Sequence, residues 1–189
     1  MPTDPHAFAL TLDGMIAQVW SMLQRGVHDR HAAARHPVLA TVSADGLPQA
    51  RTVVLRAADR AAGTLQVYTD LKSAKVADLR ATPRAALHVW DSRAHLQIRL
   101  AAKVTILSGA DVRAIWEKLP DPSRLAYGVD PAPGEPIDAA LSYARHPDAP
   151  AFGVLHLEVQ AMDVLHLGPD HRRAQFLRHD DWSGNWCAP

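Results

Sequence analysis

The sequence has little cysteine and no long hydrophobic run. Its single cysteine, Cys187, excludes an internal disulfide and fits a reducing compartment. No lysine or arginine precedes Arg25, and Asp4, Asp13 and Gln18 interrupt the apolar residues of the N-terminal segment. A signal peptide and a membrane span are therefore not expected. We predict a cytoplasmic protein that does not contact membranes.

Net charge and several nucleotide-binding motifs are also missing. The 20 Lys+Arg residues balance the 20 Asp+Glu residues, so the charge gives no reason to expect a nucleic-acid partner. The patterns GxGxxG, GxxxxGK[ST] and GxSxG do not occur, which argues against Rossmann, P-loop and hydrolase-elbow sites. Eleven histidines suggest a metal, yet His28, His31 and His36 lack an HExxH pattern or a cysteine partner, and we expect no metal site.

The length of 189 residues fits one domain over 1–189, with an N-terminal helical segment over 1–35. Apolar residues at three- and four-residue spacing predict a helix over 12–24, capped by Thr11 or Asp13 and ended by Gly26. A short second helix is expected within 28–37.

The periodicity then changes to two, which is typical of strands. Residues 38–43 and 49–56 flank the hairpin signal Asp45-Gly46. Further strands are predicted over 64–70, 85–91, 95–107, 153–168 and 173–179, with helices over 73–83 and from Ser108 to Pro120. Residues 120–137 hold five prolines and two glycines and are expected to form an irregular loop. About seven strands and three or four peripheral helices indicate a mainly β (α+β) fold, a closed or nearly closed barrel.

Two short stretches carry candidate chemistry. In RTVVLR, Arg51 and Arg56 point to opposite faces of a strand; both could simply reach into water from a sheet edge. In VYTDLKSAK, a strand ends at Tyr68 and Thr69 and a helix begins near Ser73, so backbone N–H groups, hydroxyls and Lys75 converge in the manner of a phosphate seat. Most strand-to-helix junctions bind nothing, and that alternative stays open.

If the strand over 51–56 lies beside the strand over 64–70, Arg51 reaches the same phosphate as Lys75. Arg56 then faces a different compartment, where a second anion could bind. Three charge-assisted contacts supply about half of the ~8 kcal/mol that micromolar binding requires. The rest would come from a flat hydrophobic body attached to the phosphate.

These motifs, together with the spacing from Pro83 to Trp90, Gln97-Ile98-Arg99 and the ending HRRAQF…W…AP, resemble those of the pyridoxamine 5'-phosphate oxidase-like FMN-binding split barrels. The resemblance runs from about residue 36 to the C-terminus. It implies a split β-barrel, FMN as cofactor, and a homodimer with FMN at the subunit interface. It also implies oxidoreductase chemistry carried by the flavin, so no catalytic side chain is named.

Carried over residue by residue, the resemblance implies that Gln97 approaches the flavin ring and that Arg173 reaches it from the second subunit. The implied cofactor-binding residues are Arg51, Thr52, Val53, Val54, Leu55, Arg56, Tyr68, Thr69, Ser73, Lys75, Gln97 and Arg173. The implied substrate-binding residues are Arg56, Ser123 and His171.

The departures from the family pattern concern mainly the substrate. Ala74 replaces one cationic phosphate ligand, and Arg56 or Arg173 could compensate. In the family a tyrosine and an arginine hold the substrate phosphate, and the corresponding positions here fall near Ile115 and Leu119. Trp186 stands where the family has a terminal arginine. A tryptophan that packs on the flavin in the family is replaced here near Leu165. FMN binding is thus better supported than pyridoxamine phosphate specificity. Two hypotheses follow: an oxidoreductase for a small anionic substrate, or a non-catalytic flavin or haem carrier or sensor.

Overall fold

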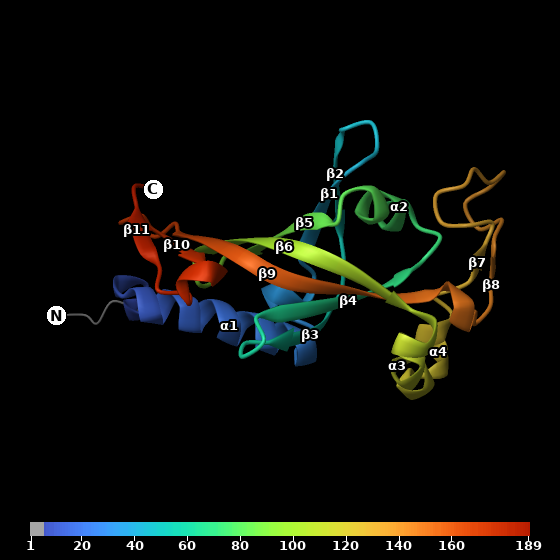
Figure 1. Cartoon of the computed structure of the whole chain (residues 1–189), viewed down its shortest axis with the longest axis horizontal. Helices are drawn as coiled ribbons and strands as arrows, with labels where there is room; N and C mark the ends of the chain where they lie inside the picture. The colour runs from blue at the N-terminus through green and yellow to red at the C-terminus, as the bar shows by residue number, and fades with distance from the viewer. Residues whose placement is uncertain (1–5) are drawn as a thin grey trace.

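The computed structural model describes residues 6–189, and its central element is one nine-stranded antiparallel sheet (Figure 1). Its strands are β1 (Val38–Val42), β2 (Pro48–Thr52), β3 (Leu55–Asp59), β4 (Thr64–Asp70), β5 (Arg84–Asp91), β6 (Leu96–Ser108), β9 (Phe152–His166), β10 (Arg172–Leu177) and β11 (Asn185–Cys187). A separate pair consists of β7 (Val129–Asp130) and β8 (Ala144–Arg145).

The sheet divides along its longest strand, β9. One edge of β9 pairs with β6 over its whole length. Its other edge is shared, because residues 152–158 pair with β4 and residues 161–166 pair with β10. The sheet therefore continues from β9 in two directions, to β4 and β3 and to β10 and β11, which is the arrangement of a split barrel. The mainly β prediction is confirmed, with more strands than the seven expected.

The predicted strand over 49–56 is two strands that pair with different neighbours. Arg51 lies in β2 opposite Leu39 of β1, whereas Leu55 lies in β3 opposite Val67 of β4. Between them the amide of Val53 donates to the Pro37 carbonyl, and the chain crosses from one part of the sheet to the other. The expectation that Arg51 lies on a strand paired with 64–70 is therefore wrong, because Arg51 belongs to the β1 side of this crossing.

Helix α1 (Leu12–His28) runs along one side of the sheet (Figure 1). Thr11 caps it, since the Gly14 amide donates to Thr11 Oγ1 at 3.0 Å. Its apolar stripe, which includes the fully buried Trp20, joins the barrel core. Gly26 does not end the helix as predicted; a Cβ there would lie 2.6 Å from the Ala34 backbone, so the glycine permits close packing.

The remaining helices are short. The helix expected within 28–37 is only the 3-10 turn Ala33–Arg35. The helix predicted over 73–83 is confirmed as α2 (Ala74–Ala81). The segment after Ser108 divides into a 3-10 turn, Gly109–Val112, and α3 (Arg113–Lys118), and Ser108 makes no side-chain cap.

Helix α4 (Asp121–Arg124) and strands β7 and β8 lie within and beyond the proline-rich segment predicted to be irregular. Together with α3 they form the end of the molecule opposite β11 and the start of α1 (Figure 1). Further 3-10 turns cover Ala7–Leu10, Ala149–Ala151 and Arg178–Asp180. No helix within 6–189 is long and apolar enough to cross a membrane, and a cytoplasmic location stays a prediction.

Candidate cofactor site

A tight turn joins the end of β4 to α2, and Asp70 fixes it. One carboxylate oxygen of Asp70 accepts from the Lys72 amide at 2.8 Å, and the other accepts from the Gly128 amide at 3.0 Å. The Asp70 carbonyl accepts from the Ser73 amide at 3.2 Å. Two of the backbone N–H groups expected to be free for a phosphate are therefore already paired, and side chains are the main donors.

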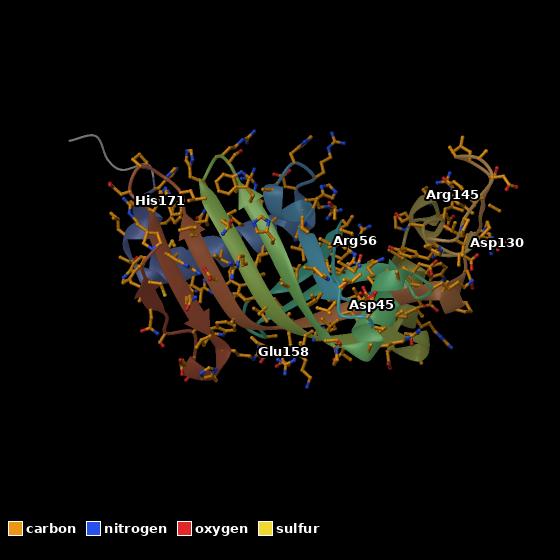
Figure 2. The ribbon with its side chains drawn as sticks, turned by 90° about the horizontal axis from the view of Figure 1, so that it is seen from above. Asp45, Arg56, Asp130, Arg145, Glu158 and His171 are labelled. Atoms are coloured by element: carbon orange, nitrogen blue, oxygen red, sulfur yellow. The ribbon has the colours of Figure 1, made fainter. Side chains whose placement is uncertain are left out.

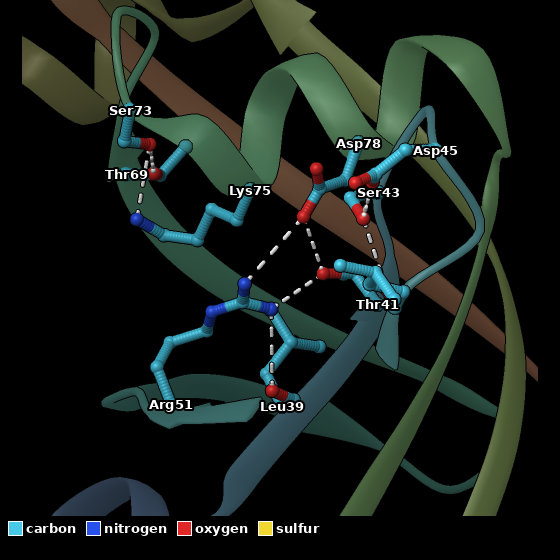
Figure 3. A network of polar contacts seen from close by, with 10 residues as sticks. Leu39, Thr41, Ser43, Asp45, Arg51, Thr69, Ser73, Lys75 and Asp78 are labelled. Atoms are coloured by element: carbon cyan, nitrogen blue, oxygen red, sulfur yellow. Dashed lines mark hydrogen bonds and ion pairs between the residues drawn. The ribbon is translucent and has the colours of Figure 1, made fainter. Parts of the chain in front are cut away.

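Three of the predicted residues meet at this turn (Figure 3). The hydroxyls of Thr69 and Ser73 lie 3.2 Å apart, and the Lys75 ammonium donates to Ser73 Oγ at 3.0 Å. Thr69 and Ser73 are buried, at 3% and 7% exposure. Ser73 occupies the N-cap position of α2, yet its hydroxyl donates to the Asp70 carbonyl at 2.7 Å instead of capping the helix.

Arg51 extends toward the same turn from β2 (Figure 3). One terminal nitrogen, Nη1, donates to Thr41 Oγ1 and lies 3.5 Å from the Leu39 carbonyl. The other, Nη2, lies 3.5 Å from Asp78 Oδ2, which also accepts from Thr41 Oγ1 at 2.7 Å. Asp78 is 7% exposed and belongs to α2, so the helix that carries Lys75 also orients Arg51.

The electrostatics of this cluster favour an anion. Burial lowers the pKa of Lys75, the Arg51 guanidinium lowers it further, and Asp70 partly offsets both. Two cations and two hydroxyls thus share a site in which, among the described residues, only the Asp78 carboxylate is directly paired with a cation. This donor set fits a phosphate group, which strengthens every one of these contacts by its charge.

Arg56 occupies a different environment from Arg51. It is the extra residue of a β-bulge, because Leu55 and Ala57 pair with the adjacent residues Val67 and Gln66. Its guanidinium lies 5.5 Å from the centre of the Tyr68 ring. Its Nε is buried and has no hydrogen-bond partner within 6–189.

Gln97 and Arg173 lie on the outer face of the sheet. Gln97 stands between the buried Leu96 and Ile98, and it pairs across the sheet with Trp90 and Leu165. Arg173 of β10 pairs with Leu165 of β9, so it lies in the same cross-strand row as Gln97. It forms a two-pronged ion pair with Asp163, at 3.0 and 2.7 Å, and this contact holds the pKa of Asp163 below its usual value.

The predicted substrate residues are not together in one chain. Arg56 lies near the middle of the molecule and His171 near the end that carries the termini (Figure 2). His171 is exposed and lines a cavity of 300 Å³ with Arg173, Trp186 and Cys187. Ser123 belongs to α4 at the opposite end (Figure 1).

The four residues between the arginines differ in exposure. Thr52 is exposed and Val54 half-buried, whereas Val53 and Leu55 are buried. Any contact of these residues with FMN stays a prediction. No cluster of His, Cys, Asp or Glu suited to a metal is found in the described part of the chain.

Sequence reasoning missed Thr41 and Asp78, which contact Arg51, and Tyr127, whose phenol lies close to Arg56. An acid at position 78 stands between the apolar Val76 and Leu79 on the predicted helix, and such a buried acid signals a cationic partner. Thr41 follows Leu39 at strand spacing, so its inward direction was readable. Tyr127 lies in the proline-rich segment, where no periodicity indicates a direction.

Comparison with known proteins identifies the family and the fold of this chain. Residues 17–108 match the family model described as the FMN-binding domain of pyridoxamine 5'-phosphate oxidase. A curated pyridoxine/pyridoxamine 5'-phosphate oxidase of Anaeromyxobacter dehalogenans is 29% identical over 177 residues, covering 86% of each chain. The corresponding enzyme of Acaryochloris marina is 34% identical over 110 residues, which are 58% of this chain and 49% of that protein. This chain thus matches about half the length of the Acaryochloris relative.

Solved structures agree. A pyridoxamine 5'-phosphate oxidase-related FMN-binding protein of Nostoc punctiforme superposes with a TM-score of 0.74 and 29% identity, covering 92% of this chain and 96% of that one. PhzG of Burkholderia lata superposes with a TM-score of 0.70 and 20% identity, which bears on the fold alone.

The fold and these matches define an FMN-binding split-barrel protein. More particularly, the chain belongs to the pyridoxamine 5'-phosphate oxidase-like family, and FMN is its cofactor.

Proposed function

We propose that this protein is a homodimeric FMN-dependent oxidoreductase that acts on a small anionic substrate. The observation that carries the proposal is the convergence of Arg51, Thr69, Ser73 and Lys75 around one turn, with Arg51 oriented by Asp78 (Figure 3). Such a cluster binds the phosphate of FMN and so orients the flavin. When bound, FMN supplies the electron-transfer chemistry.

The side chains of this protein bind and orient the reactants. Arg51 and Lys75 hold the phosphate, and Thr69 and Ser73 accept or donate hydrogen bonds beside it. Gln97 approaches the flavin ring. Arg56 orients the substrate and stabilises negative charge that develops over the ring, because its guanidinium is permanently cationic.

The homodimer is supported by the faces on which the proposed flavin contacts lie. Arg51 shares the inner face with the buried Leu39, whereas Gln97 points outward beside Trp90, which is 43% exposed. One flavin cannot lie on both faces of the same sheet. A partner chain that supplies Gln97 and Arg173 to the Arg51 and Lys75 of the first chain would complete the site.

The alternative function, a flavin-binding module without turnover, is favoured by the apolar character of Ile115 and Leu119. Both pack against a cluster built around Tyr127 and Phe152 and offer no charge to a substrate phosphate. An enzyme and a module share the cofactor, so the cofactor alone does not separate them.

The test begins with the purified protein, which should be yellow with an oxidised-flavin spectrum. Its flavin should bleach when NADPH, pyridoxamine phosphate or another donor is added without air, and the colour should return in air. A haem Soret band, or a colourless protein that does not take up FMN, contradicts the cofactor assignment. A yellow dimer that no donor bleaches supports the carrier alternative.

A further inference from the structure

The β-bulge at Arg56 directs a cation toward a group of aromatic rings. The extra residue between Leu55 and Ala57 interrupts the alternation of side chains along β3, and bulges commonly re-aim a side chain in this way. The Arg56 guanidinium lies over the Tyr68 ring at 5.5 Å, close to the distance of a cation–π contact. Arg56 is half-buried, which makes its charge sensitive to what surrounds it.

No negative charge within 6–189 balances this guanidinium. The ion pairs of the described residues do not include Arg56, and its buried Nε has no hydrogen-bond partner there. A second guanidinium, Arg35, lies near enough for the Arg56 charge to lower the Arg35 pKa, although burial lowers it more. A half-buried cation beside another cation is unfavourable unless an anion joins them.

Arg35 is engaged by backbone carbonyls of its own chain. One nitrogen of its guanidinium donates to the Val27 carbonyl at 2.7 Å and to the Leu55 carbonyl at 3.1 Å, and it lies 3.5 Å from the Gly26 carbonyl. These bonds join the C-terminal end of α1 to the start of β3. Arg35 is therefore structural, and Arg56 is the cation that faces a ligand.

The surroundings of Arg56 on the other side are apolar and aromatic. The Tyr68 ring packs edge-on to Phe152 at 5.4 Å between centroids, and Phe152 packs against Tyr127 at 4.9 Å and Trp116 at 5.4 Å. Ile115 and Leu119 pack against the same cluster. Tyr127 and Phe152 are buried, whereas Tyr68, Ile115, Trp116 and Leu119 are half-buried and keep accessible surface.

Tyr127 adds one uncharged polar group. Burial raises the pKa of its phenol, and the nearby Arg56 opposes that rise only in part. The phenol is therefore protonated at neutral pH and can donate a hydrogen bond. The anion subsite thus combines one guanidinium and one phenol with a wall of rings.

The guanidinium, the phenol and the aromatic rings together favour one class of ligand. A carboxylate carries one charge and matches the fork of a single guanidinium, whereas a phosphate monoester carries about −1.5 to −2 charges and calls for more cations. One other cation within residues 6–189, Arg124, stacks on these rings; it lies 5.5 Å from the Trp116 ring centre and is paired with Asp121 at 3.1 Å. Flat apolar ligands bury their area well against aromatic rings.

We propose that the substrate subsite of this protein accepts a flat aromatic monocarboxylate, with its carboxylate on Arg56 and its ring against the surface formed by Tyr68, Ile115, Trp116 and Leu119. The inference rests on the proposed function, because it assumes that the flavin lies beside Arg56. It gives the anionic substrate a class: an aromatic acid instead of a phosphate ester.

The test measures ligand binding to the FMN-loaded protein by equilibrium dialysis. The probes are 2-naphthoate, 2-naphthyl phosphate and the neutral 2-naphthylmethanol, which share one ring system. We expect 2-naphthoate to bind about tenfold more tightly than the alcohol, as one charge-assisted contact provides, and more tightly than the phosphate ester. Arg56→Met should remove the preference for the acid over the alcohol, whereas Arg60→Met, at an exposed arginine of the following turn, should leave it unchanged.

A second variant tests the apolar wall without touching Arg56. Leu119→Arg adds a second cation and should improve 2-naphthyl phosphate binding more than 2-naphthoate binding. The inference is overturned if the unmodified protein prefers the phosphate ester, or if Arg56→Met leaves 2-naphthoate binding unchanged. Flavin content is read separately from absorbance: a protein without FMN contradicts the proposed function, whereas a yellow protein that ignores 2-naphthoate contradicts this inference alone.

Discussion

Arg51 and Arg56 lie in the same short stretch of sequence, yet the fold treats them differently. Arg51 contacts Thr41, Asp78 and the Leu39 carbonyl, so its guanidinium is oriented before any ligand arrives. Arg56 stacks on Tyr68 and leaves a buried N–H group without a partner among the described residues. The first arginine belongs to a preorganised site, whereas the second depends on a ligand to balance its charge.

The difference has an energetic meaning. A side chain fixed before binding loses little further conformational freedom, so its contact with a ligand contributes nearly its full strength. A half-buried cation without a counter-charge instead destabilises the free protein and regains that free energy when an anion binds. We therefore expect substitutions of the two arginines to act differently on cofactor affinity and with opposite sign on stability.

The largest expected effect is on FMN affinity. Arg51→Met removes a charge-assisted contact of about 1.5–3 kcal/mol and should weaken FMN binding by roughly one to two orders of magnitude. Riboflavin, which lacks the phosphate, should bind almost as before. Arg56→Met should weaken FMN much less, because Arg56 faces the ring and substrate. Flavin fluorescence titrations of the unmodified protein and both variants measure these dissociation constants, and equal losses for FMN and riboflavin in Arg51→Met would place Arg51 away from the phosphate.

The next effect concerns the stability of the FMN-free protein. Arg51→Met leaves the buried Asp78 carboxylate with Thr41 alone and should lower the free energy of unfolding by about 1–3 kcal/mol. Arg56→Met removes an unbalanced cation beside Arg35 and should leave stability unchanged or raise it by about 0.5 kcal/mol. Chemical denaturation of both variants checks the sign. A loss in Arg56→Met as large as in Arg51→Met would show that Arg56 has a structural partner.

The sequence was sufficient for the parts of this comparison that depend on local pattern. The turn from Thr69 to Lys75 was predicted as a phosphate seat because strand spacing ends and a helix begins there, and the structure brings Thr69, Ser73 and Lys75 together. The apolar spacing that predicts a helix over 12–24 is likewise confirmed by α1, whose apolar stripe contributes the buried Trp20 to the core.

The parts that depend on long-range pairing were not readable. RTVVLR reads as one strand because every residue suits a strand, and nothing local indicates that the chain changes neighbours at Val53. The bulge at Arg56 is likewise set by the partner strand β4. Gly26 predicts a helix end by local rules, whereas the structure uses it for a close tertiary contact with Ala34 that local rules do not reveal. Local spacing predicts periodicity, whereas sheet topology decides which edge or face a residue joins.

A smaller expected effect is a pH dependence of FMN affinity that comes from Lys75. Burial lowers the pKa of Lys75 below its ordinary value of 10.5, and Arg51 adds to this. A phosphate favours the charged ammonium, so FMN affinity should fall as the pH rises through the lowered pKa, by at most tenfold per pH unit. The stability of the FMN-free protein should rise over the same range, because the unfolded chain holds this proton more tightly.

Lys75→Met is the control for this pH dependence. It removes the titrating ammonium, and any slope that remains in its FMN affinity between neutral pH and about pH 9.5 belongs to other groups. Riboflavin has no phosphate, so its affinity for the unmodified protein should not show the part of the pH dependence that Lys75 causes. An identical slope in Lys75→Met and in the unmodified protein would show that Lys75 does not sense the phosphate.

The smallest effect tests how Arg51 is oriented. Thr41 Oγ1 accepts from Arg51 and donates to Asp78 at 2.7 Å, so it joins the two charges. Thr41→Val keeps the shape and removes this link, which should cost about 1 kcal/mol, a loss of roughly fivefold in FMN affinity. Thr105→Val, at an exposed threonine of β6 outside this network, is the control for the substitution itself and should leave FMN affinity unchanged. If Thr41→Val also binds FMN normally, the Asp78 carboxylate and the Leu39 carbonyl orient Arg51 without the hydroxyl, and the preorganisation of this site does not depend on Thr41.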